Sequence, residues 1–293
     1  MRIRGGLDQC AAPRSNGSRG FFSVFLLGTV HWDPLGFRRL STFLEWFNPD
    51  CILLEFSPYG LSFRRKNQET LQRTLNRGIR EVSHRCGIPH GTVLRHPEVL
   101  AVRRQISLPF EYRATSRFSK RTGTPLFLVD HSQWSRRWIS EWPELLSWEN
   151  IYSLVALKSH ARESISQIYH RAASLIGTGG ARYRALILGF PSSNYRCRMK
   201  RERYLAKRIV RILETHVPKK PLFVGGWNHL VRNEDHPTIR QYLATRTTDC
   251  GLLDRTALTY LPSPDPAFPG ELSQSSSLSP AMKSRCLHPM RFS

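Results

Sequence analysis

Short apolar runs alternate along this chain with stretches whose apolar residues recur at helical spacing, and this alternation limits the possible folds more than any other feature. Each run is five to seven residues long, which suits a strand buried in a sheet. Repeated alternation of such strands with helices is typical of a three-layer domain. We therefore predict an α/β fold with a mostly parallel central sheet flanked by helices. The expected strands are residues 21–27, 51–56, 125–129, 184–190, 221–225 and 256–261.

Helical patterns occupy the gaps between these runs. One helix should end at Asn48-Pro49, a basic helix should follow residue 61, and another helix should end before Pro218. A single long helix is expected over residues 151–175, because the glycine-rich segment 177–180 ends its pattern.

The two ends of the chain differ in composition from its middle. Residues 1–20 and 263–293 are rich in Gly, Ser, Pro and Arg and are predicted to be flexible tails, which leaves residues 21–262 as a single α/β domain. The first 20 residues lack the apolar segment of a signal peptide, and no apolar run reaches 18 residues, so we expect no membrane segment. The cysteines are scattered without a C-x-x-C pair, which predicts free thiols in a cytoplasmic protein.

The chain is strongly basic, with 44 lysines and arginines against 22 aspartates and glutamates and a net charge of +22. Such a surface attracts polyanions. The arginines are spread along the sequence, however, and no known nucleic-acid-binding motif accompanies them. We interpret the charge as a compositional bias and do not expect a nucleic-acid partner.

A G-x-x-H motif follows two of the expected strands. Gly28 and His31 come after the first strand, and Gly226 and His229 come after the fifth. A glycine lets the backbone turn sharply or approach a ligand closely, and the imidazole that follows can then point into a cleft. A third copy, Gly87–His90, follows no apolar strand, and we attribute it to chance. The repeated unit suggests two related halves.

Carboxylates and arginines accompany these histidines at the strand ends. Glu55 ends the second apolar run and Asp130 follows the third. In an α/β sheet, ligands bind outside the carboxyl ends of the strands. The basic segment Arg201–Arg203 opens the helix before the second motif, and helical spacing places Arg203 on the same face as Val210. Each of these residues also has an interpretation without a functional role. Glu55 could form an ordinary ion pair with a neighbouring arginine, and Arg203 could lie on a solvated helix face.

Four segments, LLGTVHWD, NPDCILLEFSP, RERYLAKRI and VGGWNHL, resemble the TraB/GumN-like family in this order. That family belongs with TIKI metalloproteases, ChaN-like haem-binding proteins and erythromycin esterase-like enzymes in one superfamily. The resemblance covers about residues 21–262 and implies an α/β fold of two related halves with the site between them. Trp227 departs from the pattern, in which small residues are commoner. The residues to which the resemblance points are Gly28, His31, Glu55, Arg203 or Arg201, and His229, with Asp130 as a looser match.

The leading functional hypothesis is a hydrolase of amide or ester bonds, and two mechanisms are open. In the first, His31, Glu55 and His229 hold a divalent metal ion whose bound water attacks the carbonyl. In the second, His31 acts as a general base on water without a metal and is oriented by Glu55. In either mechanism, Arg203 or Asn228 would stabilise the developing oxyanion. The expected supporting residues are Gly28, Asp130, Arg201, Gly226 and Asn228.

The alternative hypothesis is a regulatory module that binds a peptide, haem or another small ligand in the same cleft without turnover. Both hypotheses predict a small-molecule or peptide ligand. Activities differ within the superfamily, so the fold alone does not decide between them.

Overall fold

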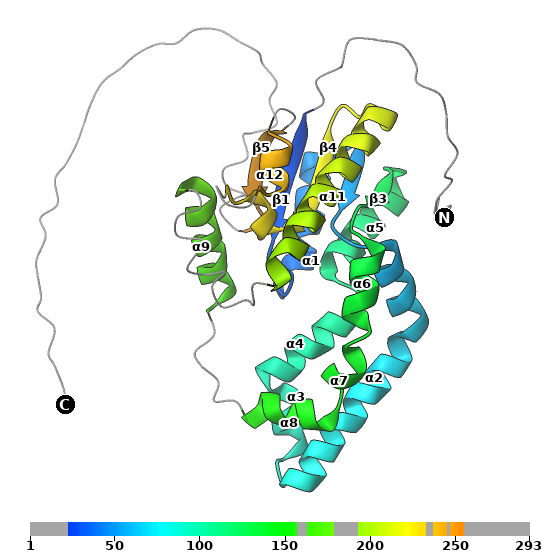
Figure 1. Ribbon diagram of the computed structural model, residues 1–293, viewed down its shortest axis with the longest axis vertical. Helices are drawn as coiled ribbons and strands as arrows, with labels where there is room; N and C mark the ends of the chain where they lie inside the picture. Colours follow the sequence, from blue (N-terminus) through cyan, green and yellow to red (C-terminus); the bar gives the residue numbers. More distant parts are fainter. Residues whose placement is uncertain (1–22, 157–162, 179–192, 233–236, 245–246, 255–293) are drawn as a thin grey trace, which may run out of the picture. The chain divides into compact units, whose positions relative to one another are not determined.

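A five-stranded parallel sheet is the centre of the computed structural model, which describes residues 23–156, 163–178, 193–232, 237–244 and 247–254 (Figure 1). The strand order is β3-β2-β4-β1-β5, and every paired strand runs parallel to its neighbour. The predicted α/β class with a parallel sheet is confirmed. The strands are β1 (Val24–Thr29), β2 (Cys51–Leu54), β3 (Leu126–Leu128), β4 (Pro221–Gly226) and β5 (Thr247–Leu252).

Four of the five strands fall on runs that the sequence indicates, and β5 does not. β5 lies at the edge of the sheet and pairs only with β1 among the described strands. An edge strand needs less apolar sequence than a central one, and the TTDCGL sequence of β5 carries no apolar run. The strands expected at residues 184–190 and 256–261 and the two predicted tails lie outside the described residues.

Helices make up most of the remaining described chain (Figure 1). They are α1 (Gly36–Phe47), α2 (Pro58–Cys86), α3 (His90–Arg95), α4 (Pro97–Ile106), α5 (Phe110–Thr122), α6 (Ser132–Ile139), α7 (Trp142–Leu145), α8 (Trp148–Ala156), α9 (Ile165–Thr178), α11 (Ser193–His216) and α12 (Ile239–Tyr242), with a short 3₁₀ helix, η2 (Trp227–Leu230).

The helix ends follow local sequence. α1 ends where Asn48 adopts a left-handed conformation with φ of 47°, a common way to end a helix. The single helix expected over residues 151–175 is wrong, because the structure has two helices, α8 and α9, in this region. Ser164 begins α9 separately: its hydroxyl accepts a hydrogen bond from the Gln167 amide, and the Gln167 side chain accepts one from the Ser164 amide.

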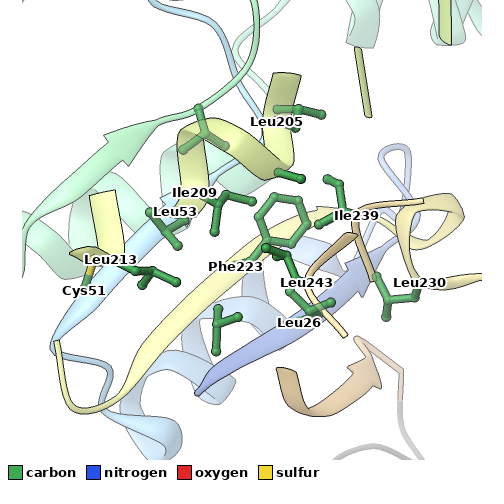
Figure 2. Close-up of a cluster of buried hydrophobic side chains, with 13 residues drawn as sticks. Leu26, Cys51, Leu53, Leu205, Ile209, Leu213, Phe223, Leu230, Ile239 and Leu243 are labelled. Carbon is green, nitrogen blue, oxygen red and sulfur yellow. The ribbon is translucent and has the colours of Figure 1, made fainter. Parts of the chain in front are cut away.

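One face of the sheet packs against α11 (Figure 2). Leu53, Phe223 and Leu26 lie in register across β2, β4 and β1 and are fully buried. Because side chains alternate along a strand, these residues share one face. The buried stripe of α11 that covers this face consists of Leu205, Ala206, Ile209 and Leu213.

The opposite face of the sheet packs against α1. The Phe25 ring of β1 lies 5.9 Å from the Phe43 ring and 5.2 Å from the Phe47 ring, measured between centroids. α1 in turn packs on α5. The sheet is therefore covered on both faces, as its near-continuous apolar strands require.

A second hydrophobic cluster lies among the helices and uses no strand residue. It joins the buried side of α2 to α4, α6, α7 and α8, and Trp142, Leu75 and Ile151 are among its most buried members. No helix in the described part of the chain is long and apolar enough to cross a membrane. The four cysteines that the structure describes, at positions 51, 86, 197 and 250, are free thiols.

Leu26 and Leu35 form a matched pair for testing the core, because Leu26 is fully buried and Leu35 is 53% exposed. Leu26→Ala should lower the free energy of unfolding by about 2–5 kcal/mol, since it leaves a cavity under α11. Leu35→Ala should change it by less than about 0.5 kcal/mol. Urea unfolding of the two variants checks this, and equal losses would contradict the packing described above.

Candidate functional site

Four polar side chains follow four neighbouring strands at one edge of the sheet. His31 follows β1, Glu55 follows β2, Asp130 follows β3 and His229 follows β4. The strands are parallel, so their carboxyl ends meet at this edge. The register pairs Gly28 with Gly225 and so sets the two G-x-x-H units side by side.

The imidazole of His31 is half exposed, and its inner side is held by a buried carboxylate. Its Nδ1 lies 2.8 Å from Oε1 of Glu111, whose side chain is only 4% exposed. The same oxygen accepts a 2.9 Å hydrogen bond from Thr29 Oγ1. Glu111 stands in the first turn of α5, where the helix dipole favours a negative charge. The partial burial of the ring would lower the pKa of His31, but the Glu111 carboxylate outweighs this effect and raises that pKa above its ordinary value.

The imidazole of His229 is buried and contacts a carboxylate on each side. Its Nε2 lies 2.9 Å from Oε1 of Glu55, and its Nδ1 lies 2.7 Å from Oε1 of Glu202. The Nδ1 contact is an ion pair by distance but lacks hydrogen-bond alignment. The other oxygen of Glu202 accepts a 2.9 Å hydrogen bond from the Ile239 amide at the start of α12. Burial would lower the pKa of His229, but Glu202 and Glu55 together raise it to about 10.

Glu55 is the carboxylate at the centre of the cluster. Its Oε2 accepts a 2.6 Å hydrogen bond from the Gly226 amide, and its Oε1 accepts a 2.5 Å hydrogen bond from Arg201 Nη2. Burial by itself raises the pKa of this carboxyl, but His229 and Arg201 outweigh burial and hold it well below its ordinary value. Glu55 is therefore a permanent anion at neutral pH.

Arg201 joins two strand ends through one guanidinium. Its Nε and Nη2 donate to the two oxygens of Asp130 at 2.9 and 2.8 Å, and Nη2 also reaches Glu55. Burial would lower the pKa of Arg201, but Glu55 and Asp130 raise it further above its ordinary value.

Arg203, the arginine favoured by the sequence pattern, is exposed and makes none of these contacts. The placement of Arg203 at this edge is therefore corrected in favour of Arg201. The two arginines flank the buried stripe of α11 on opposite sides, and only the Arg201 side meets the ends of β2 and β3.

Two glycines at the end of β4 are required by space. A Cβ on Gly225 would lie 2.8 Å from Glu55 Oε2, and one on Gly226 would lie 2.9 Å from His31 Nε2 and 3.5 Å from Glu55 Oε2. Gly226 has φ of −60° and ψ of 140°, which any residue can adopt, so its backbone does not demand glycine. One small volume beside Gly226 is thus bordered by both His31 and Glu55.

The other supporting residues predicted from the sequence lie beside this cluster. Gly28 packs tightly, because a Cβ there would lie 3.0 Å from Leu252 Cδ2 and 3.0 Å from the Trp227 Cα. Asn228 precedes His229 within η2. The structure brings His31, Glu55, Asp130, Arg201, Gly226 and His229 together at one edge.

The predicted metal set of His31, Glu55 and His229 does not fit a divalent ion as these side chains stand. His229 faces Glu55 through Nε2 and Glu202 through Nδ1, and these two carboxylates raise its pKa and so favour the protonated ring over the neutral ring that a metal ion requires. Both oxygens of Glu55 already accept from donors. Among the described residues, no group of three or more His, Cys, Asp or Glu side chains is placed to hold a metal ion.

Two carboxylates of the site, Glu111 and Glu202, were not predicted from the sequence. Glu202 had a usable signal, because it lies three and seven residues before Leu205 and Ile209 and therefore on the buried stripe of α11. Glu111 had only a weak signal: it is an acidic residue that follows Pro109 at the start of a helix. Its contact with His31 spans 80 residues of sequence.

Comparison of the chain with family models, curated proteins and solved structures finds no match.

Gly226→Ala tests the tight volume between His31 and Glu55. The added methyl group meets His31 Nε2 and should lower the free energy of unfolding by about 1–3 kcal/mol, the usual cost of overpacking. Gly177→Ala is the control, because a Cβ there has no described atom within 4 Å and Gly177 lies in α9. Thermal unfolding of both variants gives the comparison, and a stabilising Gly226→Ala would show that the volume is open.

The pH dependence of stability tests the charge on His229. Its pKa is raised in the folded state, so the stabilisation is fully present below the ordinary value of 6.5 and is lost as pH rises towards about 10. The difference in unfolding free energy between the wild type and His229→Gln should therefore shrink from pH 6.5 to pH 10. His84→Gln, on the exposed side of α2, is the control and should show no such trend. A pH-independent difference for His229→Gln would mean that the imidazole is neutral.

Proposed function

We propose that the chain is a hydrolase of amide or ester bonds in which His31 activates a water molecule. The pairing of a half-exposed imidazole with a buried carboxylate, His31 with Glu111, carries this proposal. Such a pair fixes the ring, and the carboxylate stabilises the imidazolium that forms when the ring takes a proton. The sequence motifs that resemble the TraB/GumN-like family support the same proposal.

The two histidines have different roles in this proposal. His229 is buried between Glu55 and Glu202 and stays protonated, so it is a poor base at neutral pH. His31 reaches solvent, and its Nε2 borders the small volume beside Gly226. Glu111 rather than Glu55 orients His31, since it is the carboxylate bonded to Nδ1.

The proposed hydrolysis uses one group to take a proton from water and another to stabilise the oxyanion. His31 Nε2 takes a proton from water as the oxygen attacks the carbonyl carbon, and Glu111 stabilises the resulting imidazolium. Arg201 is 29% exposed and uses Nε and Nη2 for Asp130 and Glu55, so its Nη1 is the donor we assign to the oxyanion. When the tetrahedral intermediate collapses, His31 returns its proton to the leaving oxygen or nitrogen.

Turnover measurements on two variants, one of which should lose activity, test this proposal. A panel of ester and peptide substrates identifies a turnover assay, in which His31→Ala should lower kcat by about 10²–10⁴-fold because it removes the general base. His90→Ala, at the exposed histidine of the third G-x-x-H copy, is the matched control and should retain full activity. If no substrate turns over above the His31→Ala background while a ligand binds saturably, the chain is a binding module instead.

The pH dependence of activity shows whether Glu111 acts on His31 or has only a structural role. Activity should rise with pH as His31 loses its proton, and this rise should be centred above the ordinary pKa of 6.5. In Glu111→Gln the rise should move to lower pH, because the carboxylate that raises the pKa is gone. Metal analysis provides the complementary measurement: a stoichiometric divalent ion, lost in both His31→Ala and His229→Ala, would contradict the metal-free mechanism.

A further inference from the structure

The turn that carries His31 is held by a helix that is distant in sequence. A 2.9 Å hydrogen bond from the Asp33 amide to the Val30 carbonyl oxygen closes this turn, and we call residues 30–33 the His31 turn. The Tyr169 hydroxyl of α9 accepts a 3.3 Å hydrogen bond from the Val30 amide and donates one of 3.3 Å to Oδ2 of Asp33. One hydroxyl therefore contacts the residues that begin and end the His31 turn.

Asp33, the acceptor at the end of this turn, is itself fixed in place. It is buried, its Oδ1 accepts a 2.9 Å hydrogen bond from the Leu35 amide, and its Oδ2 accepts one of 2.7 Å from Arg39 Nη1. The Arg39 guanidinium also lies 5.9 Å from the Tyr169 ring centroid. Burial raises the pKa of Tyr169 above its ordinary value, so the hydroxyl keeps the proton that it donates to Asp33.

The side of the turn that faces α5 is held by Glu111. Thr29, which precedes the turn, donates a 2.9 Å hydrogen bond to Oε1 of Glu111, and His31 Nδ1 lies 2.8 Å from the same oxygen. Glu111 contacts the ring of His31, whereas Tyr169 contacts the backbone of its turn. The ring can meet Glu111 only while that backbone keeps its position, so the contact with Glu111 depends on the anchor at Tyr169.

Helix α9 also contacts the second G-x-x-H unit. Arg240 Nη1 donates to the carbonyl oxygens of Ile176 in α9 and Leu230 in η2, at 3.2 and 3.1 Å. The 3₁₀ helix η2 carries His229. The helix that holds the His31 turn through Tyr169 is thus joined to the segment of the other histidine as well.

We propose that Tyr169 is a positioning residue that holds the His31 turn, and with it the His31 imidazole, against Glu111. The inference rests on the proposed function, in which His31 is the general base. Tyr169 acts through His31 and takes no part in the proton transfer itself. A misplacement of about 1 Å at a reacting group can cost about 100-fold in rate, so a single hydrogen-bonded anchor of the turn matters to catalysis.

Tyr169→Phe tests the proposal, because it removes the hydroxyl and keeps the ring. In the turnover assay it should lower kcat by about tenfold with little change in KM, since the base is misplaced and the rest of the site is intact. Tyr112→Phe is the matched control: Tyr112 is also buried, but its hydroxyl accepts from Arg65 and not from the His31 turn. The control should keep the wild-type kcat, and urea unfolding measures the stability lost in each variant.

The imidazole of His31 reports on the same contact without any substrate. NMR titration of the full chain follows its Cε1 proton, which is assigned by its absence in His31→Ala. The charged groups that face this ring are Glu111 of α5, Glu55 after β2 and His229 of η2, and all three are retained in Tyr169→Phe. This variant should still lower the pKa of His31 by about 0.5, towards the ordinary value of 6.5, because the loosened turn separates the ring from Glu111. The control variant should leave that pKa unchanged.

The two readouts separate this proposal from the proposed hydrolase activity. If the pKa of His31 falls in Tyr169→Phe but no substrate turns over in the wild type, the positioning role stands and the hydrolase fails. If the wild type turns over substrate and Tyr169→Phe keeps both its kcat and the pKa of His31, the positioning role is overturned. Equal changes in Tyr169→Phe and Tyr112→Phe would overturn it too, because they would show a general loss of stability.

Arg39→Gln decides the matter if Tyr169→Phe does not fold. This substitution removes the other side-chain donor to Oδ2 of Asp33 and so loosens the same turn. Loss of a positive charge would by itself raise the pKa of a nearby histidine, so a lowered pKa of His31 in this variant marks the lost contact with Glu111. An unchanged or raised pKa there would overturn the proposal.

Discussion

The ion pairs of Glu55 hold together parts of the molecule that are far apart in sequence. Its carboxylate ends β2 and contacts Arg201 of α11, the Gly226 amide of β4 and the imidazole of His229. A buried charge that lost one of these partners would cost several kcal/mol. The end of β4 and the part of α11 around Arg201 are therefore fixed by the same anion that lies at the centre of the site.

The strand ends were predictable from the sequence, and the contacts behind them were not. The apolar runs before His31, Glu55 and His229 indicated parallel strands, and parallel strands place their carboxyl ends at one edge. β5 was not predicted because an edge strand needs little apolar sequence. The role of Glu111 was not predicted because its partner is distant in sequence and a first-turn glutamate is common in any helix.

The choice between Arg201 and Arg203 shows where periodicity stops being informative. Successive residues of a helix are separated by about 100°, so both arginines lie beside the stripe centred on Glu202 and differ only in side. Which side meets the sheet edge depends on how α11 crosses the strands, and that is a property of tertiary packing. The apolar stripe itself is visible in the sequence, and a carboxylate within it, Glu202, was the stronger signal.

The two G-x-x-H units show how similar local sequence gives different chemistry. Each places a histidine after a glycine at a strand end, and β1 and β4 are neighbours. After β4 the chain turns into η2, which buries His229 between two carboxylates. After β1 the chain forms a turn closed by a hydrogen bond from the Asp33 amide to the Val30 carbonyl oxygen, and His31 contacts one carboxylate and solvent. Two carboxylates fix a proton on an imidazole, whereas one carboxylate raises its basicity and leaves a nitrogen able to exchange protons. His31 is therefore suited to proton transfer, and His229 is suited to holding the site together.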